Sequence, residues 1–385
     1  MPPSRRDVLK TLPAVAAVSL TSAGAESPPA AGLTVRMSEP ANLEADFSAV
    51  KEFITPTDQF FVRSHFARPK IDVNTWTLEV SGAVEKPLKL TFAEITAMAK
   101  QSTPLTLECA GNGRVFLAPA TRGLQWQQGA VSTAEWGGIT LKSILDLAGV
   151  KPNTKEVIMV GADSGSIADP ATPGVIHFDR SIPIEKAMKP ECILATHMNG
   201  EPLTASHGFP LRAVIGGWYG MAAVKWLTRI VVTDKPYDGF WQTFDYSHWQ
   251  RRDGGLATLV PVTAMQPKAQ IARPTFGEVV PASAKYTIRG AAWAGETNPK
   301  SVEVSTDSGT TWAEAKFTTD AKPFCWRLWE FEWNVPAATG TVKLMTRCTD
   351  DLGQRQPDKR DGDRRTYMIN HTIPVDVTIG KRRSE

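Results

Sequence analysis

The segment with the densest chemistry runs over residues 105–114 and reads Leu-Thr-Leu-Glu-Cys-Ala-Gly-Asn-Gly-Arg. Its apolar start predicts a strand that ends at Cys109, followed by a tight turn through Gly111 and Gly113. A thiol at a strand end, beside free backbone amides and a guanidinium, ionises readily and can act as a nucleophile or as a metal-binding thiolate. A buried structural cysteine beside a tight turn explains the spacing equally well.

The pattern of cysteines limits which metal such a thiol could bind. The chain has 4 Cys but no Cys-x-x-Cys and no Cys-x-x-Cys-His, which excludes zinc ribbons, iron–sulfur clusters and attached c-type haem. One thiolate does not hold a metal ion by itself, so a cofactor would have to supply the other ligands. We expect Cys192 to be structural, because it lies on an apolar strand. Cys325 and Cys348 could form a disulfide in an exported domain, although their spacing does not require one.

Several other reactive side chains lie in motifs that spacing alone leaves open. His207 precedes Gly-Phe-Pro and would by itself be a turn residue, and Lys225 would lie on a solvated face. Tyr246 would be a packing residue, and the charged run 359–365 an exposed loop.

The elements that would position these residues are short strands mixed with short helices over residues 43–258. Strands are predicted at 75–82, 157–161 and 193–198. Helices are predicted at 92–99, after a Thr91–Glu94 capping box, and at 140–148, before Gly149. Strands and helices do not alternate at the βαβ period, so we expect an α+β fold and not a Rossmann sheet.

Residues 259–385 have a different pattern, with several prolines followed by alternating strand-like runs. Strands are predicted at 286–290, 302–306, 311–317, 326–333 and 342–349. Short strands at this spacing, with turn residues between them, are typical of an immunoglobulin-like β-sandwich.

The overall composition is that of a soluble globular protein. The 385 residues predict two or three domains, and 42% hydrophobic with 22% charged residues supply a sizeable core. A net charge of +3 is too small to indicate a nucleic-acid partner.

Residues 1–25 have the features of an export signal. Arg5 and Arg6 precede the apolar run 12–20 and an Ala-Gly-Ala site, a pattern that is typical of a twin-arginine signal peptide; the alternative is a disordered basic tail. The run is shorter than the ~20 residues that span a membrane. We therefore predict a bacterial periplasmic protein without a membrane span. Residues 26–42 are expected to form an extended lead without regular structure.

Five motifs in this order resemble the sulfite oxidase family of molybdenum–pterin enzymes. They are Phe60-Phe-Val-Arg-Ser-His65, Cys109-Ala-Gly-Asn-Gly-Arg114, His207-Gly-Phe-Pro-Leu-Arg212, Val224-Lys-Trp-Leu227 and Tyr246-Ser-His-Trp-Gln250. The resemblance covers essentially all of the chain after the signal. It implies a mixed α/β molybdopterin-binding catalytic domain followed by an immunoglobulin-like dimerisation domain, and hence a homodimer.

The resemblance also implies a role for each matching residue. Cys109 would be the protein ligand of molybdenum, with further sulfurs from a pterin dithiolene. Arg63 would face the substrate oxyanion, and Tyr246 would lie near the metal. Arg365 would be a further substrate arginine, although residues 363–367 lack the Trp-Asn-x-x-Gly frame of the family, so that Arg364 remains an alternative.

The implied cofactor-binding residues are Phe61, Val62, Arg63, Ser64, His65, Cys109, Arg114, Asp163, His207, Arg212, Ala223, Val224 and Lys225. Among them, His207, Arg212 and Lys225 would supply the cations and donors that a buried phosphate needs. Asp163 would contact the pterin, and Arg114 would support the cysteine loop.

These residues imply the oxidation of sulfite to sulfate by oxygen-atom transfer. The chain shows neither a haem-binding nor a flavin-binding motif, so the electrons would leave to a separate c-type cytochrome. One alternative is a sulfoxide or N-oxide reductase with the same cofactor; Arg63, Tyr246 and Arg365 favour a sulfur oxyanion over a neutral sulfoxide. Another alternative is a non-catalytic exported binding protein, which would contain no molybdenum.

Overall fold

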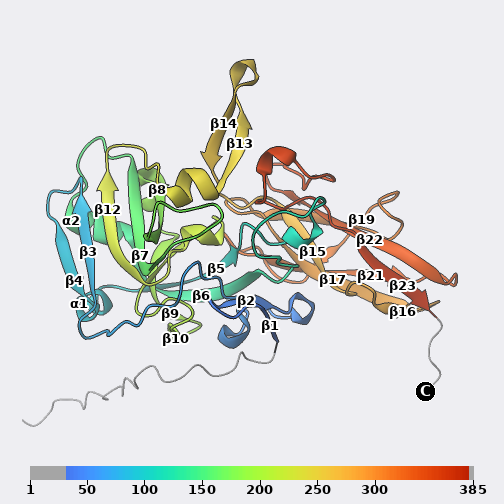
Figure 1. Cartoon of the computed structure of the whole chain (residues 1–385). Helices are drawn as coiled ribbons and strands as arrows, with labels where there is room; N and C mark the ends of the chain where they lie inside the picture. The colour runs from blue at the N-terminus through green and yellow to red at the C-terminus, as the bar shows by residue number, and fades with distance from the viewer. Residues whose placement is uncertain (1–31, 381–385) are drawn as a thin grey trace, which may run out of the picture.

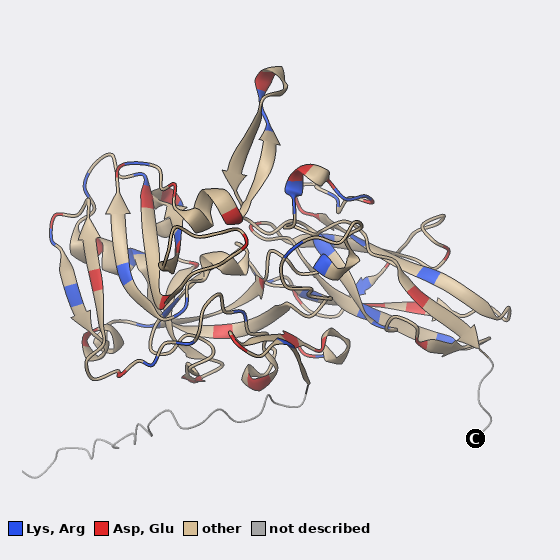
Figure 2. Cartoon of the chain, viewed as in Figure 1, with Lys and Arg blue, Asp and Glu red and all other residues tan. Residues whose placement is uncertain are grey.

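The computed structural model describes residues 32–380, so the predicted signal peptide lies outside the described residues. Figure 1 shows two halves packed side by side, with a hairpin projecting near their boundary. Lys, Arg, Asp and Glu residues are interspersed over both halves (Figure 2). Among the described residues, no helix has the length and apolar character needed to cross a membrane.

The first half contains two five-stranded sheets that share one apolar core, formed by residues such as Leu78 and Met159 of one sheet and Ile139 and Leu194 of the other. One sheet has the order β4 (Leu88–Thr91), β3 (Thr77–Gly82), β12 (Leu227–Thr233), β7 (Glu156–Gly165), β8 (Ile176–Pro183). The other has the order β10 (Glu201–Pro202), β9 (Cys192–Met198), β6 (Val131–Thr140), β5 (Gln101–Glu108), with β11 (Arg212–Ile215) also on β9. Only β3 and β12 pair in parallel among these described strands.

Three short α-helices accompany these sheets: α1 (Phe92–Ala97), α2 (Leu141–Ala148) and α3 (Ile184–Ala187). The predicted capping box is present, because the Thr91 hydroxyl accepts from the backbone of Glu94 while the Glu94 carboxylate accepts from the backbone of Thr91. Gly149 ends α2 in the left-handed conformation at φ 68°. Helices are few, so this half is richer in strand than the mixed α/β domain that the resemblance implies.

The lead segment is more ordered than its sequence predicts. Leu33–Met37 (β1) pairs with Asn42–Ala45 (β2) as an antiparallel hairpin, so the prediction of no regular structure up to residue 42 is wrong for this part. The ion pair between Arg36 and Glu44 joins the two strands. The Glu44 carboxylate also accepts from Gly129 N at 2.8 Å, which fastens the hairpin to the body.

The second half consists of two sheets packed face to face around a second core that includes Ile288, Trp329, Val304 and Leu344. One sheet has the order β15 (Lys268–Arg273), β17 (Lys285–Trp293), β21 (Arg327–Asn334), β20 (Lys316–Phe317). The other has the order β16 (Val279–Pro281), β23 (Val375–Gly380), β22 (Gly340–Asp350), β18 (Pro299–Ser305), β19 (Ala313–Glu314).

Two predictions for this half need correction. Residues 311–317 are not one strand but two short edge strands in opposite sheets, β19 and β20, because the buried Ala315 between them turns the chain from one layer to the other. Cys325 and Cys348 are unpaired thiols; the Cys325 thiol donates instead to Pro104 O at 3.0 Å. Cys192 is fully buried, as expected of a structural cysteine.

The projecting hairpin consists of β13 (Ser247–Arg251) and β14 (Ala257–Pro261) (Figure 1). It follows a π-helical turn, η5 (Phe240–Asp245), and Tyr246 lies between the turn and the hairpin. The Tyr246 ring packs against that of Tyr367 at 4.7 Å, so Tyr246 lies where the two halves meet.

Candidate active site

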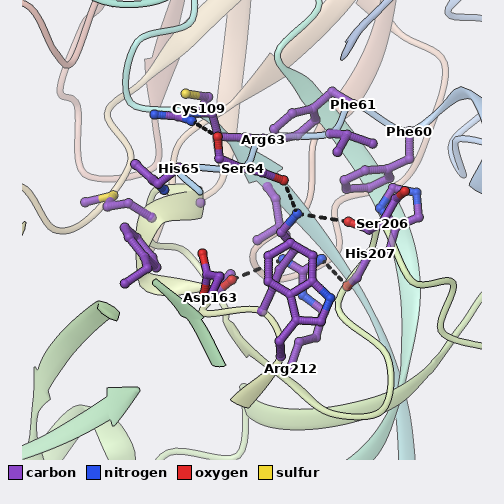
Figure 3. Close-up of a pocket in the computed structure, with 18 of the residues that line it drawn as sticks. Phe60, Phe61, Arg63, Ser64, His65, Cys109, Asp163, Ser206, His207 and Arg212 are labelled. Carbon is purple, nitrogen blue, oxygen red and sulfur yellow. Dashed lines mark hydrogen bonds between the residues drawn. The ribbon is translucent and has the colours of Figure 1, made fainter. Parts of the chain in front are cut away.

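A pocket collects side chains from segments that are far apart in the sequence (Figure 3). Its lining includes most of the predicted site residues: Phe61, Val62, Arg63, Ser64, His65, Cys109, Asp163, His207, Arg212, Ala223, Lys225 and Tyr246. In Figure 3 the Cys109 thiol lies at one end of this inner pocket, near Arg63, and Asp163 and Arg212 lie towards the other.

A second cavity, an outer cleft, adjoins the inner pocket. Arg63, His65, Cys109 and Tyr246 line both cavities, so these four residues form the junction between them. The outer cleft adds two further guanidinium groups, those of Arg114 and Arg122, and aromatic walls from Trp126, Trp241 and Tyr367. The predicted thiol thus lies where a polar pocket meets an arginine-lined cleft.

The backbone around Cys109 is fixed on both sides. Cys109 N donates to Ala130 O at 2.8 Å, and Asn112 N donates to Cys109 O at 2.8 Å, which closes the turn. A Cβ on Gly111 would lie 2.3 Å from the Arg114 guanidinium, so any larger residue here would displace that group from its position over the turn. Cys109 is 7% exposed, lines both cavities and has no disulfide partner.

Arg114 fastens the cysteine loop to neighbouring segments by hydrogen bonds, as the resemblance implies. Its Nε donates to Thr366 Oγ1 at 2.8 Å and its Nη1 to Leu124 O at 2.7 Å. These contacts tie the cysteine loop to residue 366 of the second half. Arg114 lines the outer cleft and not the inner pocket. It is therefore placed towards the implied substrate and not towards the implied pterin.

His65 and Tyr246 form one hydrogen-bonded unit at the junction. Tyr246 Oη lies 2.6 Å from His65 Nε2, and the His65 ring stacks on Phe178 at 4.1 Å. Burial and the nearby Arg63 lower the pKa of His65, whereas burial raises the pKa of Tyr246 to about 12. The imidazole is therefore neutral and the phenol protonated, and one hydrogen bond, whose direction follows the His65 tautomer, joins them.

The end of the inner pocket away from Cys109 contains buried ionisable side chains, some of whose polar atoms have no hydrogen-bond partner. Arg212 donates to His207 O at 3.0 Å and Ala223 O at 3.2 Å, but its buried Nε has no partner. Burial lowers its pKa to about 9. Lys225 Nζ donates to Ser64 Oγ at 2.8 Å, and burial together with Arg212 lowers its pKa strongly. Among the described residues that line this pocket, Asp163 is the one acidic side chain beside Arg212 and Lys225.

Asp163 is the complementary group of this pocket. Its Oδ1 is buried and accepts no hydrogen bond. Burial raises its pKa to about 7, an effect that the neighbouring Lys225 opposes. An unfilled carboxylate oxygen and two poorly neutralised cations are what a ligand with N–H donors and an anionic tail would satisfy.

His207 is placed in the inner pocket but does not supply the expected positive charge. Its Nε2 donates to Thr57 O at 3.1 Å. Burial, Arg212 and Lys225 lower its pKa to about 3, so the ring is neutral. The prediction that His207 acts as a cation is therefore corrected: it fastens the segment around Thr57 and offers its carbonyl oxygen to Arg212.

Two predicted site residues lie outside both cavities. Val224 is fully buried in the apolar core next to Ala223. Arg365 adopts φ 55° and its Nη1 donates to Phe244 O at 3.0 Å and to Ser247 Oγ at 2.6 Å. It caps the carbonyls at the end of η5 instead of reaching the cleft.

The alternative Arg364 does not line the cavities either, since its guanidinium contacts Asn370 Oδ1 at 3.0 Å and Asp361. The sequence reasoning missed Arg122, whose Nη2 lies 3.3 Å from Asp245 Oδ1 in the outer cleft. It also missed Asn42, whose Oδ1 accepts from Ser64 N at 3.0 Å and from Arg63 Nη1 at 3.2 Å. Neither residue lies in a motif, so the sequence carried no signal for them.

The donor set fits the molybdenum–pterin group that the resemblance implies. Cys109 could supply a soft sulfur ligand, Arg212 Nε and Lys225 could bind a phosphate, and Asp163 Oδ1 could accept from a ring N–H. Among the described residues, no cluster of three or more His, Cys, Asp or Glu side chains could hold a metal ion, so the remaining ligands would have to come from the cofactor.

Comparisons with known proteins agree with this geometry. The oxidoreductase molybdopterin binding domain matches residues 65–241, and the Mo-co oxidoreductase dimerisation domain matches residues 260–378. Mitochondrial sulfite oxidase of Homo sapiens is 35% identical over 351 residues, 85% of this chain and 62% of that protein. Sulfite oxidase of Gallus gallus is 33% identical over 348 residues, 85% of this chain and 73% of that protein.

Nitrate reductase [NADH] of Solanum lycopersicum is also similar, at 32% identity over 370 residues, 89% of this chain and 40% of that protein. This chain spans 61–62% of the length of the mammalian sulfite oxidases. The crystal structure of the sulfane dehydrogenase SoxCD from Paracoccus pantotrophus superimposes with a TM-score of 0.75 at 26% identity, covering 100% of this chain and 96% of the other. With a cysteine-centred pocket and both of the family's domains in order, the chain belongs to the sulfite oxidase family of molybdopterin oxidoreductases.

Proposed function

We propose that this protein oxidises sulfite to sulfate with a molybdenum–pterin cofactor and passes the electrons to a separate c-type cytochrome. The observation that carries the proposal is the junction of the two cavities at Cys109. On one side the inner pocket offers Arg212, Lys225 and Asp163 to a cofactor. On the other side the outer cleft offers guanidinium groups to an anion.

The cofactor, bound in the inner pocket, would supply oxygen-atom transfer and two-electron redox chemistry at its metal. Sulfite and water give sulfate, two protons and two electrons. The protein's contribution is binding and placement, because a compact dianion loses its hydration shell on entering the cleft and needs replacement donors.

Three arginines are available for that task. Arg63 is held by Asn42 Oδ1 at the junction, Arg114 is fixed by Thr366, and Arg122 stands at the wall of the cleft. The protonated Tyr246 adds a neutral hydroxyl whose position is set by its hydrogen bond to His65. In this proposal Arg122, which lines the outer cleft, has the role that the resemblance implies for Arg365, so the oxyanion site keeps its cationic character.

The proposal includes a periplasmic location, reached by the twin-arginine route, and a homodimer formed through the second half, with its sheets of the immunoglobulin type. The dimerisation-domain match over residues 260–378 supports the homodimer. The Arg5-Arg6 motif supports the export route.

Metal analysis and anaerobic kinetics test the function. Purified protein should contain molybdenum at about one atom per chain and should oxidise sulfite with a c-type cytochrome or ferricyanide as acceptor. The same preparation should be assayed for reduction of nitrate, dimethyl sulfoxide and methionine sulfoxide with a reduced viologen. Protein without molybdenum contradicts the enzyme; molybdenum with reductase activity but no sulfite oxidation contradicts the substrate and direction.

A further inference from the structure

A buried polar cluster lies directly behind the cysteine loop, between β5 and the β15–β17 sheet of the second half. We call it the Glu108 cluster; its members are Glu108, Asn112, Lys268, Gln270 and Trp293. The side chains of Glu108 and Lys268 are 2% and 1% exposed. Neither residue lines the inner pocket or the outer cleft.

Both carboxylate oxygens of Glu108 are used by partners in the second half. Lys268 Nζ donates to Glu108 Oε1 at 2.8 Å, and Trp293 Nε1 donates to Glu108 Oε2 at 2.8 Å. Lys268 and Trp293 face each other across β15 and β17, so the sheet presents them as a pair.

The same sheet also binds the turn that follows Cys109. Lys268 Nζ donates to Asn112 O at 3.3 Å, and Asn112 Nδ2 donates to Gln270 Oε1 at 3.2 Å. Asn112 Nδ2 reaches back to Glu108 Oε1 at 3.1 Å. Cys109 therefore lies between two residues that are both fixed by the second half.

Stability alone does not account for this arrangement. Replacing a buried ion pair by apolar side chains of similar volume is often neutral or stabilising, because both charges must be desolvated. A fully bonded buried network instead imposes one geometry on the groups attached to it. Here the attached group is the backbone of Cys109, whose thiol lies at the junction of the two cavities.

We propose that Lys268 is a positioning residue for Cys109: through Glu108 and Asn112 it fixes the direction of the thiol, so that the metal–thiolate geometry depends on the packing of the second half. This inference rests on the proposed function, in which Cys109 binds molybdenum. The residues of the Glu108 cluster touch neither cofactor nor substrate and act through the loop.

Three variants separate positioning from stability. Lys268→Met removes the charge and keeps the chain length, and Glu108→Leu/Lys268→Met removes both charges. The matched control is Lys186→Met. Lys186 pairs with Glu296 of the second half at 2.8 Å and with Glu191, and it lines neither cavity.

In the holoenzyme we expect both cluster variants to shift the g-values of the Mo(V) electron paramagnetic resonance signal. We also expect both to lower kcat for sulfite about tenfold or more with little change in KM, since small misplacements of a reacting group are costly. The double variant should recover the melting temperature that Lys268→Met loses, but not the spectrum. An unchanged spectrum in Lys268→Met, or an equal shift in Lys186→Met, overturns the inference.

A second measurement does not need the metal. In the full-length chain produced without molybdenum, mass spectrometry would follow alkylation of Cys109 by iodoacetamide. Lys268→Met should label about tenfold faster than the native chain and Lys186→Met, because the loop opens more often. Equal rates contradict the inference while leaving the sulfite activity intact. Faster labelling in a protein that binds no molybdenum refutes the proposed function and keeps the positioning role.

Discussion

Replacing Arg122 and replacing Arg365 should have opposite effects on the kinetics of sulfite oxidation. One substitution at each position therefore tests whether the outer cleft binds the substrate. Arg122 lines the cleft, whereas Arg365 is bound to the backbone around Phe244 and Ser247. We expect Arg122→Gln to weaken substrate binding and Arg365→Gln to act through the placement of Tyr246.

The magnitudes follow from the contacts of each guanidinium. A hydrogen bond to a charged group contributes about 1.5–3 kcal/mol, which corresponds to a change of about 10- to 100-fold. Arg122 already pairs with Asp245 at 3.3 Å and its side chain is 37% exposed, so solvent screening places its effect at the lower end. We expect about a tenfold increase in KM for Arg122→Gln with kcat nearly unchanged.

Arg365→Gln should have the opposite signature. The Nη1 of Arg365 contacts three carbonyl oxygens and one hydroxyl between residues 244 and 247, and Tyr246 lies within that segment. Loosening the segment moves the Tyr246 phenol, which is hydrogen-bonded to His65, so kcat should fall about tenfold while KM stays within about twofold.

The assay is anaerobic steady-state kinetics over a range of sulfite concentrations at about 0.15 M ionic strength, where long-range charge effects are screened beyond about 8 Å. Arg251→Gln is the control for the loss of one positive charge. Arg251 lies on the projecting hairpin and pairs with Asp363. Its side chain is 61% exposed, and it lines neither cavity. A tenfold rise in KM for Arg365→Gln together with normal kinetics for Arg122→Gln would refute the assignment of the cleft.

Three further outcomes are expected. Cys109→Ser should lower sulfite oxidation by several orders of magnitude while the pterin content, measured by fluorescence after oxidation, stays near normal, because the charges for the phosphate lie elsewhere. Arg212→Met should lose pterin content yet raise the melting temperature of the cofactor-free chain, because a buried cation with an unpartnered Nε is removed. Folding raises the pKa of Asp163 from 3.8 to about 7, so the folded cofactor-free chain binds more protons between these values and its free energy of unfolding decreases as the pH rises through them. Urea titrations at about pH 5 and about pH 8 should show that Asp163→Asn lacks this decrease.

Local sequence signals predicted local structure well. The capping box at Thr91 and the left-handed Gly149 define their helices through contacts within four residues, so the sequence alone contains them. The hairpin of β1 and β2 was missed because its stability comes from outside it. Glu44 accepts from Gly129, and Leu43 exchanges hydrogen bonds with Val62.

In the site, too, the sequence motifs located residues, whereas the charge and direction of a side chain depend on its surroundings in the fold. The matching motifs placed Arg63, Cys109 and Lys225 at one pocket, as the resemblance implied. The residue type did not reveal that His207 is neutral, because its charge depends on burial and on two neighbouring cations. Nor did it reveal that the backbone at residue 365 turns the guanidinium away from the cleft.

The two halves cannot be assigned separate functions, since residues of both build the site. The molybdopterin-binding match ends at residue 241 and the dimerisation match begins at 260, but Tyr246 lies between them and Lys268 and Thr366 lie within the second. Lys268 and Trp293 of the second half bond both carboxylate oxygens of the buried Glu108, and Thr366 bonds Arg114. Removing the Lys268 charge while Glu108 stays buried would leave an uncompensated carboxylate beside Cys109, which is costly. The β15–β17 sheet, which lies within the dimerisation-domain match, is therefore also a structural part of the site around Cys109.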